Sequence, residues 1–112
     1  YWAYNVNTAS VIGAVQTAAA ATYPVGAIST NINSTFYHSM IVDNVCGSNT
    51  SGTRTPGASQ TSIWSVSANG SMAAGSRKPL AAAGATTMSW TLTANSQTTA
   101  LLHSVVELKI IQ

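Results

Sequence analysis

The fold is decided at the C-terminal end of the chain, where Thr98–Gln112 reads TTALLHSVVELKIIQ. Side chains of a β-strand point alternately to its two faces, so even and odd positions form separate surfaces. The even positions here are nearly all apolar, whereas the odd positions are mixed and carry Glu107 and Lys109, the two charges of the segment. This period of two predicts a long, half-buried β-strand.

The preceding segment shows the same alternation, with apolar side chains at Met88, Trp90, Leu92 and Ala94 and Thr or Ser between them. Residues 95–97 are Asn, Ser and Gln, which favour a turn. The two segments together therefore predict a β-hairpin that supplies a large part of one sheet.

Four further segments have the length and composition of short strands. They are Ser10–Gln16, Ala27–Asn33, Thr35–Val45 and Thr61–Ser67. Thr35–Val45 carries apolar side chains on both faces, which indicates a central strand. The alternative for Thr8–Thr22, a short helix, is weaker than a strand followed by an alanine-rich connector, because every other segment has strand character.

Two long stretches are rich in Gly, Ser, Thr, Asn, Ala and Pro and are predicted to be loops: residues 47–60 and residues 68–84, with Arg77, Lys78 and Pro79 at the centre of the second. Seven or eight short strands separated by turns predict an all-β fold, a single antiparallel β-sandwich of jelly-roll or Greek-key topology. We expect residues 1–22 to form an N-terminal extension strand and connector, and residues 23–112 to form the sandwich domain.

The composition is unusual for a protein of 112 residues, since apolar residues make up 46% and charged residues 5%. Ordinary soluble domains carry about 25% charged residues. Disorder does not explain the deficit, because disordered chains combine low hydrophobicity with high net charge. Net charge and scattered ions normally oppose association. We therefore expect a surface that is covered by neighbouring subunits, by sugars, or by both.

The charges and the cysteine exclude several classes of function. The net charge of +2 comes from four scattered cations, which do not form the basic stripe of a nucleic-acid-binding protein. Cys46 has no second cysteine with which to form an intrachain disulfide. We expect no metal, no cofactor and no catalytic activity. The chain also has no apolar run long enough to predict a transmembrane helix.

Histidines and acids are too few for a catalytic or metal constellation. His38 and His103 each lie in an alternating segment without an acid at useful spacing, so a structural role is favoured for both. A triad of Asp43, His38 and a serine has no supporting local motif. Glu107 and Lys109 share one strand face and are expected to form an exposed ion pair. The alternative is a buried Lys-Asn amide crosslink.

Three asparagines stand in acceptor sequons for N-glycosylation: Asn33, Asn49 and Asn69. The last two fall in the predicted loops. Such triplets also arise by chance in a chain rich in Ser, Thr and Asn.

The N-terminus alternates as well, with Trp2, Tyr4 and Val6 on one side and Ala3, Asn5 and Asn7 on the other. A chain that begins with Tyr1 suggests a processed, secreted protein. Exposed aromatic side chains are costly in water, so this strand is expected to dock. One hypothesis is donor-strand complementation, in which the strand completes the sheet of the next subunit through Trp2, Tyr4 and Val6. The other is that the strand pairs within its own sheet.

In style, the chain resembles the subunits of archaeal extracellular threads and bundling pili, and more loosely TasA-like fibre proteins. The resemblance is carried by the N-terminal strand, the Ser/Thr/Ala/Gly-rich β-domain, the sequons and the segments Thr86–Leu92 and Val105–Lys109. It implies a secreted, glycosylated β-sandwich that polymerises head to tail into a filament on the cell surface.

Two other classes of function compete with a filament subunit. One is a viral capsid, tail or decoration protein, since small uncharged sandwiches also build shells and tubes. The other is a carbohydrate-binding module in which Trp64, Trp90 or Tyr37 stacks on sugar rings.

Overall fold

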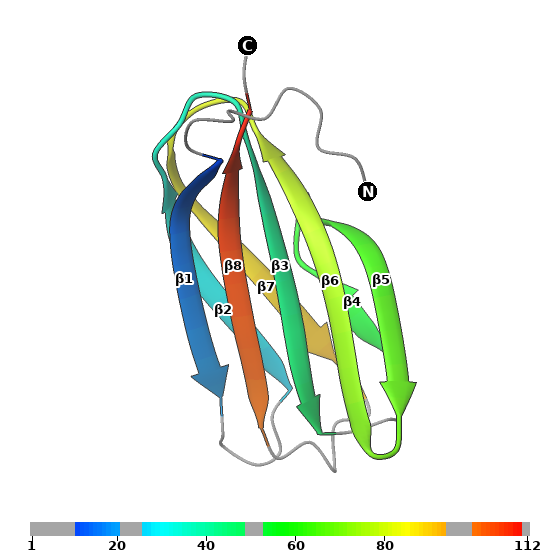
Figure 1. Cartoon of the computed structure of the whole chain (residues 1–112). Coiled ribbons are helices and arrows are strands. Elements are labelled where there is room, and N and C mark those ends of the chain that lie inside the picture. Colours follow the sequence, from blue (N-terminus) through cyan, green and yellow to red (C-terminus); the bar gives the residue numbers. More distant parts are fainter. Residues whose placement is uncertain (1–10, 21–25, 49–52, 94–99, 111–112) are drawn as a thin grey trace.

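The computed structural model describes residues 11–20, 26–48, 53–93 and 100–110, and these residues form strands and turns without a helix (Figure 1). The eight strands in chain order are β1 (Ile12–Ala20), β2 (Ala27–Ser34), β3 (Ser39–Ser48), β4 (Arg54–Pro56), β5 (Thr61–Ala68), β6 (Ser71–Leu80), β7 (Gly84–Leu92) and β8 (Leu101–Lys109).

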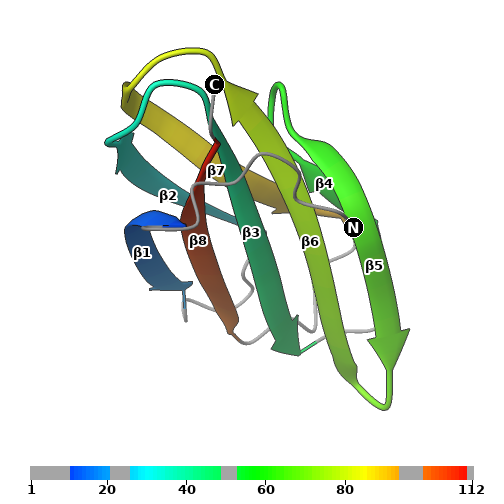
Figure 2. The same ribbon diagram turned by 45° about the horizontal axis from the view of Figure 1, so that its top comes forward.

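The strands form two antiparallel sheets packed face to face, so the predicted single β-sandwich is confirmed (Figures 1 and 2). The larger sheet has the order β1-β8-β3-β6-β5 and the smaller sheet the order β2-β7-β4. Among the described strands, β5 and β6 are the one consecutive pair in the same sheet, and the other connections pass between the sheets. Crossed connections of this kind characterise jelly-roll and Greek-key sandwiches.

The core between the sheets consists of two apolar clusters. The first contains Ile28, Val45, Met72, Ala74, Trp90, Leu92 and Leu101, and the second contains Ile32, Ile41, Met88 and Val105. Both draw on strands from each sheet, so the clusters hold the two layers together. Apolar burial of this kind is the main favourable term in folding.

The strand at the C-terminal end is present, and its mixed face points inward. Leu101, His103, Val105 and Glu107 are buried, whereas Leu102, on the apolar face, is 57% exposed. A polar group can be buried when its hydrogen bonds are satisfied. His103 and Glu107 meet that condition, as shown below, so apolar character alone does not decide which face is inside.

The predicted hairpin of the two C-terminal strands is wrong. β7 lies in the three-stranded sheet between β2 and β4, whereas β8 lies in the five-stranded sheet between β1 and β3. The connection between them therefore crosses the sandwich instead of turning within one sheet. Because β8 has a strand on both sides, it is a central strand of the larger sheet.

The second predicted loop, residues 68–84, instead contains the ten-residue strand β6. Its Ala, Gly and Ser side chains have low strand propensity, but β6 pairs with β3 on one side and β5 on the other. The turn before it is Asn69-Gly70, with φ of 51° and 79°. Two left-handed residues make the two-residue hairpin turn whose twist matches that of the strands.

Two boundaries also differ from the sequence-based prediction. The alanines expected to form a connector belong to β1, which includes Ile12–Ala20 and excludes a helix there. The predicted strand Thr35–Val45 begins later, at Ser39, because the backbone of residues 34–36 turns around the Glu107 carboxylate. The short strand β4 lies inside the first predicted loop.

Candidate functional site

The outer face of the five-stranded sheet is largely apolar. Paired residues of neighbouring strands lie on the same face, so the register shows which side chains share it. One row joins Val15, Val106 and Val42 and continues to Arg77 and Thr61, and a second joins Ala19, Leu102, Cys46, Ala73 and Val66. The row between them is more polar and joins Thr17, Ser104, Asn44, Gly75 and Trp64. Val15, Val66 and Leu102 are each more than half exposed. We call this surface the apolar face.

Both edge strands of this sheet lack charged residues. β1 reads IGAVQTAAA and β5 reads TSIWSVSA. All eight residues of β5 are exposed, including Ile63, Trp64 and Val66. Trp64 lies over Gly75 of β6, because a Cβ added there would collide with its indole ring. Edge strands normally carry charges or prolines that prevent pairing with other chains.

The outer face of the three-stranded sheet is different in character. Its exposed side chains are hydroxyls and amides, including Ser29, Asn31 and Asn33 of β2 and Thr87 and Thr91 of β7. The Thr87 hydroxyl donates a 2.7 Å hydrogen bond to Oδ1 of Asn31. The sandwich therefore has one polar, uncharged face and one apolar face.

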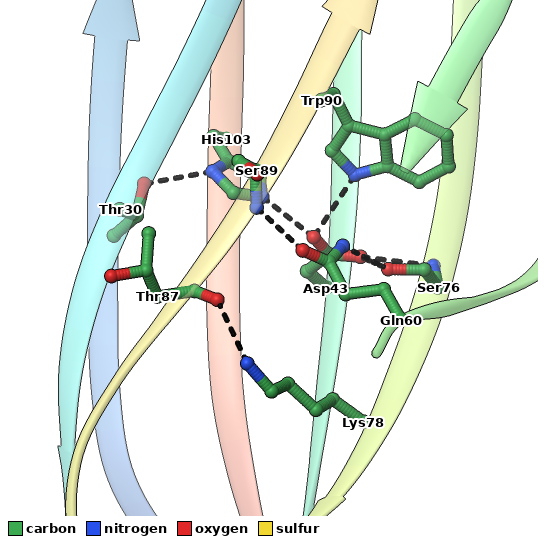
Figure 3. Close-up of polar contacts among 9 residues, drawn as sticks. All are labelled: Thr30, Asp43, Gln60, Ser76, Lys78, Thr87, Ser89, Trp90 and His103. Atoms are coloured by element: carbon green, nitrogen blue, oxygen red, sulfur yellow. Dashed lines mark hydrogen bonds and ion pairs between the residues drawn. The ribbon is translucent and has the colours of Figure 1, made fainter. Parts of the chain in front are cut away.

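A buried polar network centres on Asp43 of β3 (Figure 3). Its Oδ1 accepts hydrogen bonds from the backbone N–H of Ser76 at 2.9 Å and from the Ser76 hydroxyl at 2.6 Å. Its Oδ2 accepts from Nε1 of Trp90 at 3.0 Å and from Nε2 of His103 at 2.7 Å. The carboxylate thus joins β3, β6, β8 and, through Trp90, β7 of the opposite sheet.

Gln60 extends this network towards the side of the sandwich near β4. Its Nε2 donates to the Ser76 hydroxyl at 2.8 Å, and its Oε1 accepts from the backbone N–H of Ser89 at 2.7 Å (Figure 3). The side chain therefore links β6 to β7 just beyond the end of β4. Among the described residues, β4 pairs with β7 at residues 90–92, so no strand pairs with Ser89 on the β4 side of β7.

The His103 ring lies between Asp43 and Thr30, in an order similar to that of a catalytic triad. Nε2 donates to Asp43, because a carboxylate only accepts, and Nδ1 lies 2.7 Å from Oγ1 of Thr30. All three residues are less than 8% exposed, and no pocket opens on the described part of the chain. A substrate has no route to this relay, and the geometry is that of an internal brace between the sheets.

A second network surrounds Glu107 of β8, which is fully buried. Oε2 accepts from the backbone N–H of Ala14 at 2.9 Å and from the Thr35 hydroxyl at 2.9 Å. Oε1 accepts from the Ser34 hydroxyl at 2.7 Å and from the backbone N–H of Phe36 at 3.1 Å. The backbone N–H of Thr35 contacts both oxygens at 3.1 Å.

These donors determine the ionisation of Glu107. Burial alone would raise the pKa of this carboxyl, but hydrogen bonds from Ala14, Ser34 and Thr35 outweigh it and lower the pKa from 4.5 to about 2. The side chain is therefore a carboxylate at neutral pH. It fastens the start of β1 and the β2–β3 connection to β8.

The structure corrects the predictions for the histidines and acids. Asp43 pairs with His103 and not with His38, whose ring makes an edge contact with Tyr37 at 4.1 Å between centroids. The predicted exposed ion pair of Glu107 and Lys109 is wrong, because Glu107 is buried among N–H and hydroxyl donors. The Lys109 ammonium lies 5.9 Å from the Phe36 ring centroid.

The aromatic and sequon predictions have mixed outcomes. Trp90 is 1% exposed and cannot stack on a sugar, whereas Trp64 and Tyr37 are exposed. Asn33 is exposed on β2, and Asn69 is exposed in the β5–β6 turn. The predicted donor-strand residues Trp2, Tyr4 and Val6, and the sequon residue Asn49, lie outside the described residues.

The sequence contained a signal for both buried networks. His103 and Glu107 alternate with Leu101 and Val105 on one strand face, and Asp43 shares a face with Ile41. Polar groups at alternating apolar positions suggest buried, satisfied side chains. The donors could not be identified in this way, because Ser34, Ser76 and Trp90 are far away in the chain.

Two searches for specific sites and three comparisons gave negative results. Within the described residues, no group of three or more His, Cys, Asp or Glu is placed to hold a metal ion, and no helix is long and apolar enough to span a membrane. Comparisons with known protein families, curated proteins and solved structures found no match.

Proposed function

We propose that this protein is a structural subunit of an extracellular filament, polymerised by insertion of its N-terminal strand into the sheet of a neighbouring subunit. The observation that carries the proposal is the exposed apolar face, bounded by the uncharged edge strands β1 and β5. Monomeric proteins rarely expose contiguous apolar surfaces, and such surfaces mark interaction sites.

The distribution of charge supports the same proposal. The chain has two acidic side chains, Asp43 and Glu107, and both are buried in hydrogen-bonded networks. Acidic surface residues are the most effective at keeping proteins soluble. A surface without them does not resist close packing of copies.

The N-terminal segment supplies a suitable donor. Trp2, Tyr4 and Val6 alternate with Ala3, Asn5 and Asn7, the pattern of a strand with one bulky apolar face. In β-strand addition, backbone hydrogen bonds provide affinity and alternate side chains provide specificity. Head-to-tail contacts of this type propagate into open filaments.

Secretion and N-glycosylation are part of the proposal. Asn69 is the best placed acceptor, because it lies in an exposed turn and Ser71 of its sequon is also exposed. In the sequon of Asn33, the Thr35 hydroxyl donates to the buried Glu107 carboxylate. We therefore expect glycans on Asn69 before Asn33.

Negative-stain electron microscopy of the purified protein tests the proposal. The intact chain is expected to form filaments, and a chain lacking residues 1–7 is expected to remain as soluble particles. The variant Trp2→Ser/Tyr4→Ser/Val6→Ser should behave like the deletion. Its matched control is Ala3→Ser/Asn5→Ser/Asn7→Ser, which changes the other face of the same strand and should still assemble. Intact protein that stays monomeric, or a deletion that assembles equally well, contradicts the proposal.

A carbohydrate-binding module is the second candidate, favoured by Trp64. Trp64 is 42% exposed and its indole ring lies against Gly75, which leaves aromatic surface on which a sugar ring could stack. In that case the protein would bind glycans while remaining a monomer or a closed oligomer. Trp64→Ala would abolish glycan binding. Tyr37→Ala would show whether the second exposed ring contributes to binding.

A further inference from the structure

Most free strand edges in the described part of the chain have a feature that discourages pairing with a strand of another chain. One edge lacks such a feature. β1 and β2 lie next to each other at one side of the sandwich, so each partly covers the edge of the other (Figure 1). β4 is three residues long and contains Arg54 and Pro56. Short length, charge and proline all discourage the addition of a strand.

The edge of β7 beyond β4 is protected by a lysine. β4 pairs with β7 over residues 90–92, so no described strand covers the earlier part of β7 on that side. There the Lys78 ammonium, from β6 of the opposite sheet, reaches the carbonyl oxygen of Thr87 at 3.4 Å (Figure 3). An inward-pointing charge of this kind is a known protection of sheet edges.

The exception is β5, the last strand of the larger sheet. It has no charged residue of its own, no proline and eight exposed residues, although Nε of Arg54 in β4 donates to the Ser65 hydroxyl at 2.8 Å. Its single irregularity is the bulge between Ser62 and Trp64, which leaves Trp64–Ala68 as a regular ladder. The free edge of β5 is therefore five residues long.

The hairpin geometry identifies which groups on this edge are available. The two-residue turn makes Ala68 and Ser71 a hydrogen-bonded pair. In an antiparallel ladder, residues alternate between bonding to the neighbouring strand and pointing away from it. The backbone N–H and C=O groups of Ser65 and Ser67 therefore point outward.

The two faces of β5 match the two faces of the N-terminal segment. Trp64 and Val66 lie on the apolar face, whereas Ser65 and Ser67 lie on the opposite side of the strand. The segment 2–6 has the same length as the free edge and alternates large apolar with small or amide side chains. Pairs of aromatic and β-branched side chains on adjacent strands stabilise a sheet.

The N-terminal segment cannot reach this edge within its own chain. β1 and β5 are four strand spacings apart in the sheet order, about 19 Å at ~4.8 Å each. Residues 8–10 allow at most about 14 Å between Asn7 and Val11. A pairing of this segment with β5 therefore takes place between two copies of the chain.

We propose that β5 is the acceptor edge: residues 2–6 of one copy pair with Trp64–Ala68 of the next, with Trp2, Tyr4 and Val6 continuing the apolar face beside Trp64 and Val66. This inference rests on the proposed function and specifies where the donor strand binds. The donor segment precedes β1 and the acceptor is β5, so the two sites lie at opposite edges of one sheet. After each addition, one end of the filament still carries a free donor segment and the other end a free acceptor edge, so growth is open-ended.

Variants of the full-length chain test this inference. Val66→Lys places a charge on the acceptor edge at a residue that is 59% exposed, and Ser29→Lys is the control, at an exposed residue of β2 on the polar face of the other sheet. Val66→Lys is expected to raise the critical concentration for filament formation about tenfold or more, whereas Ser29→Lys leaves it within about twofold.

A second pair separates the backbone from the side chain. Ser67→Pro removes the outward N–H, and Ser67→Ala removes the hydroxyl but keeps that N–H. Filaments are expected to be lost in the first variant and retained in the second, with unchanged far-UV circular dichroism in both. Normal assembly of folded Val66→Lys and Ser67→Pro, or a block by Ser29→Lys alone, overturns the acceptor assignment while the filament function stands. Wild-type protein that forms no filaments overturns both.

Discussion

Replacing Glu107 by glutamine tests the idea that the carboxylate fastens three parts of the chain. Glutamine has nearly the same shape but exchanges one acceptor oxygen for an NH₂ group. The two oxygens face backbone N–H groups from different segments, Ala14 at Oε2 and Phe36 at Oε1. Whichever oxygen is replaced, one of these buried N–H groups then faces another donor.

The expected cost follows from these contacts. An unsatisfied buried donor costs about 1–3 kcal/mol, and the remaining hydrogen bonds lose the strength that the charge gives them. The same hydrogen bonds lower the pKa of Glu107 from 4.5 to about 2, which corresponds to about 3 kcal/mol before solvent screening reduces it. We therefore expect Glu107→Gln to lower the free energy of unfolding by about 2–3 kcal/mol at pH 7.

The sign of the pH dependence follows from the lowered pKa. A carboxyl whose pKa is lower in the folded state stabilises the fold above its unfolded pKa, and this contribution is lost as pH falls. The difference between wild type and Glu107→Gln should therefore be constant above about pH 5 and shrink between pH 4.5 and pH 2.

Urea unfolding followed by circular dichroism between pH 2 and pH 7 measures this difference. The matched control is Lys109→Gln, which removes a charge two residues away on the same strand and should change stability by about 0.5 kcal/mol or less. A Glu107→Gln difference below 0.5 kcal/mol at pH 7, or one that does not change with pH, would refute the reasoning.

Three further predictions concern the networks and the turn. Trp90→Phe keeps an aromatic ring but removes the Nε1–H donor to Asp43, so it should destabilise the fold by about 1–3 kcal/mol in urea unfolding. Gly13→Ala places a methyl group against the Glu107 carboxylate and should lower the melting temperature, with a smaller effect when combined with Glu107→Ala, which removes the carboxylate that the methyl group meets. Asn69→Gln should remove one glycan mass from protein secreted by a glycosylating host, and an unchanged mass would exclude occupancy of this sequon.

The strand pattern and the fold class could be predicted from the sequence because they depend on local alternation. β2, β5 and β8 lie within a few residues of their predicted ranges, and the sandwich follows from their number. β6 could not be predicted in this way, since its small side chains have loop-like composition and are held in place by β3 and β5. Its strand character comes from tertiary pairing and not from propensity.

The partners of the buried acids were beyond prediction for a related reason. Ser34 and Thr35 are more than 70 residues from Glu107, and Asp43 is 60 residues from His103. No local pattern distinguishes these hydroxyls from the many other Ser and Thr residues of the chain. The apolar face was equally hidden, because it requires knowing which face of each strand is inside.

The buried networks also explain how a strand with two apolar faces adopts one register. A one-residue slip of β8 would exchange its inner and outer side chains, and in most sheets the loss of the apolar pattern forbids this. Here the outer side chains Leu102, Val106 and Leu108 are also apolar, so a slip would still place apolar side chains on the inner face. The slip is instead opposed by His103 and Glu107. After a slip, these side chains would no longer contact their hydrogen-bond partners, and buried N–H and hydroxyl donors would lack acceptors. Polar groups inside the sandwich thus specify the fold and leave the outer face free to carry apolar side chains, as the proposed assembly requires.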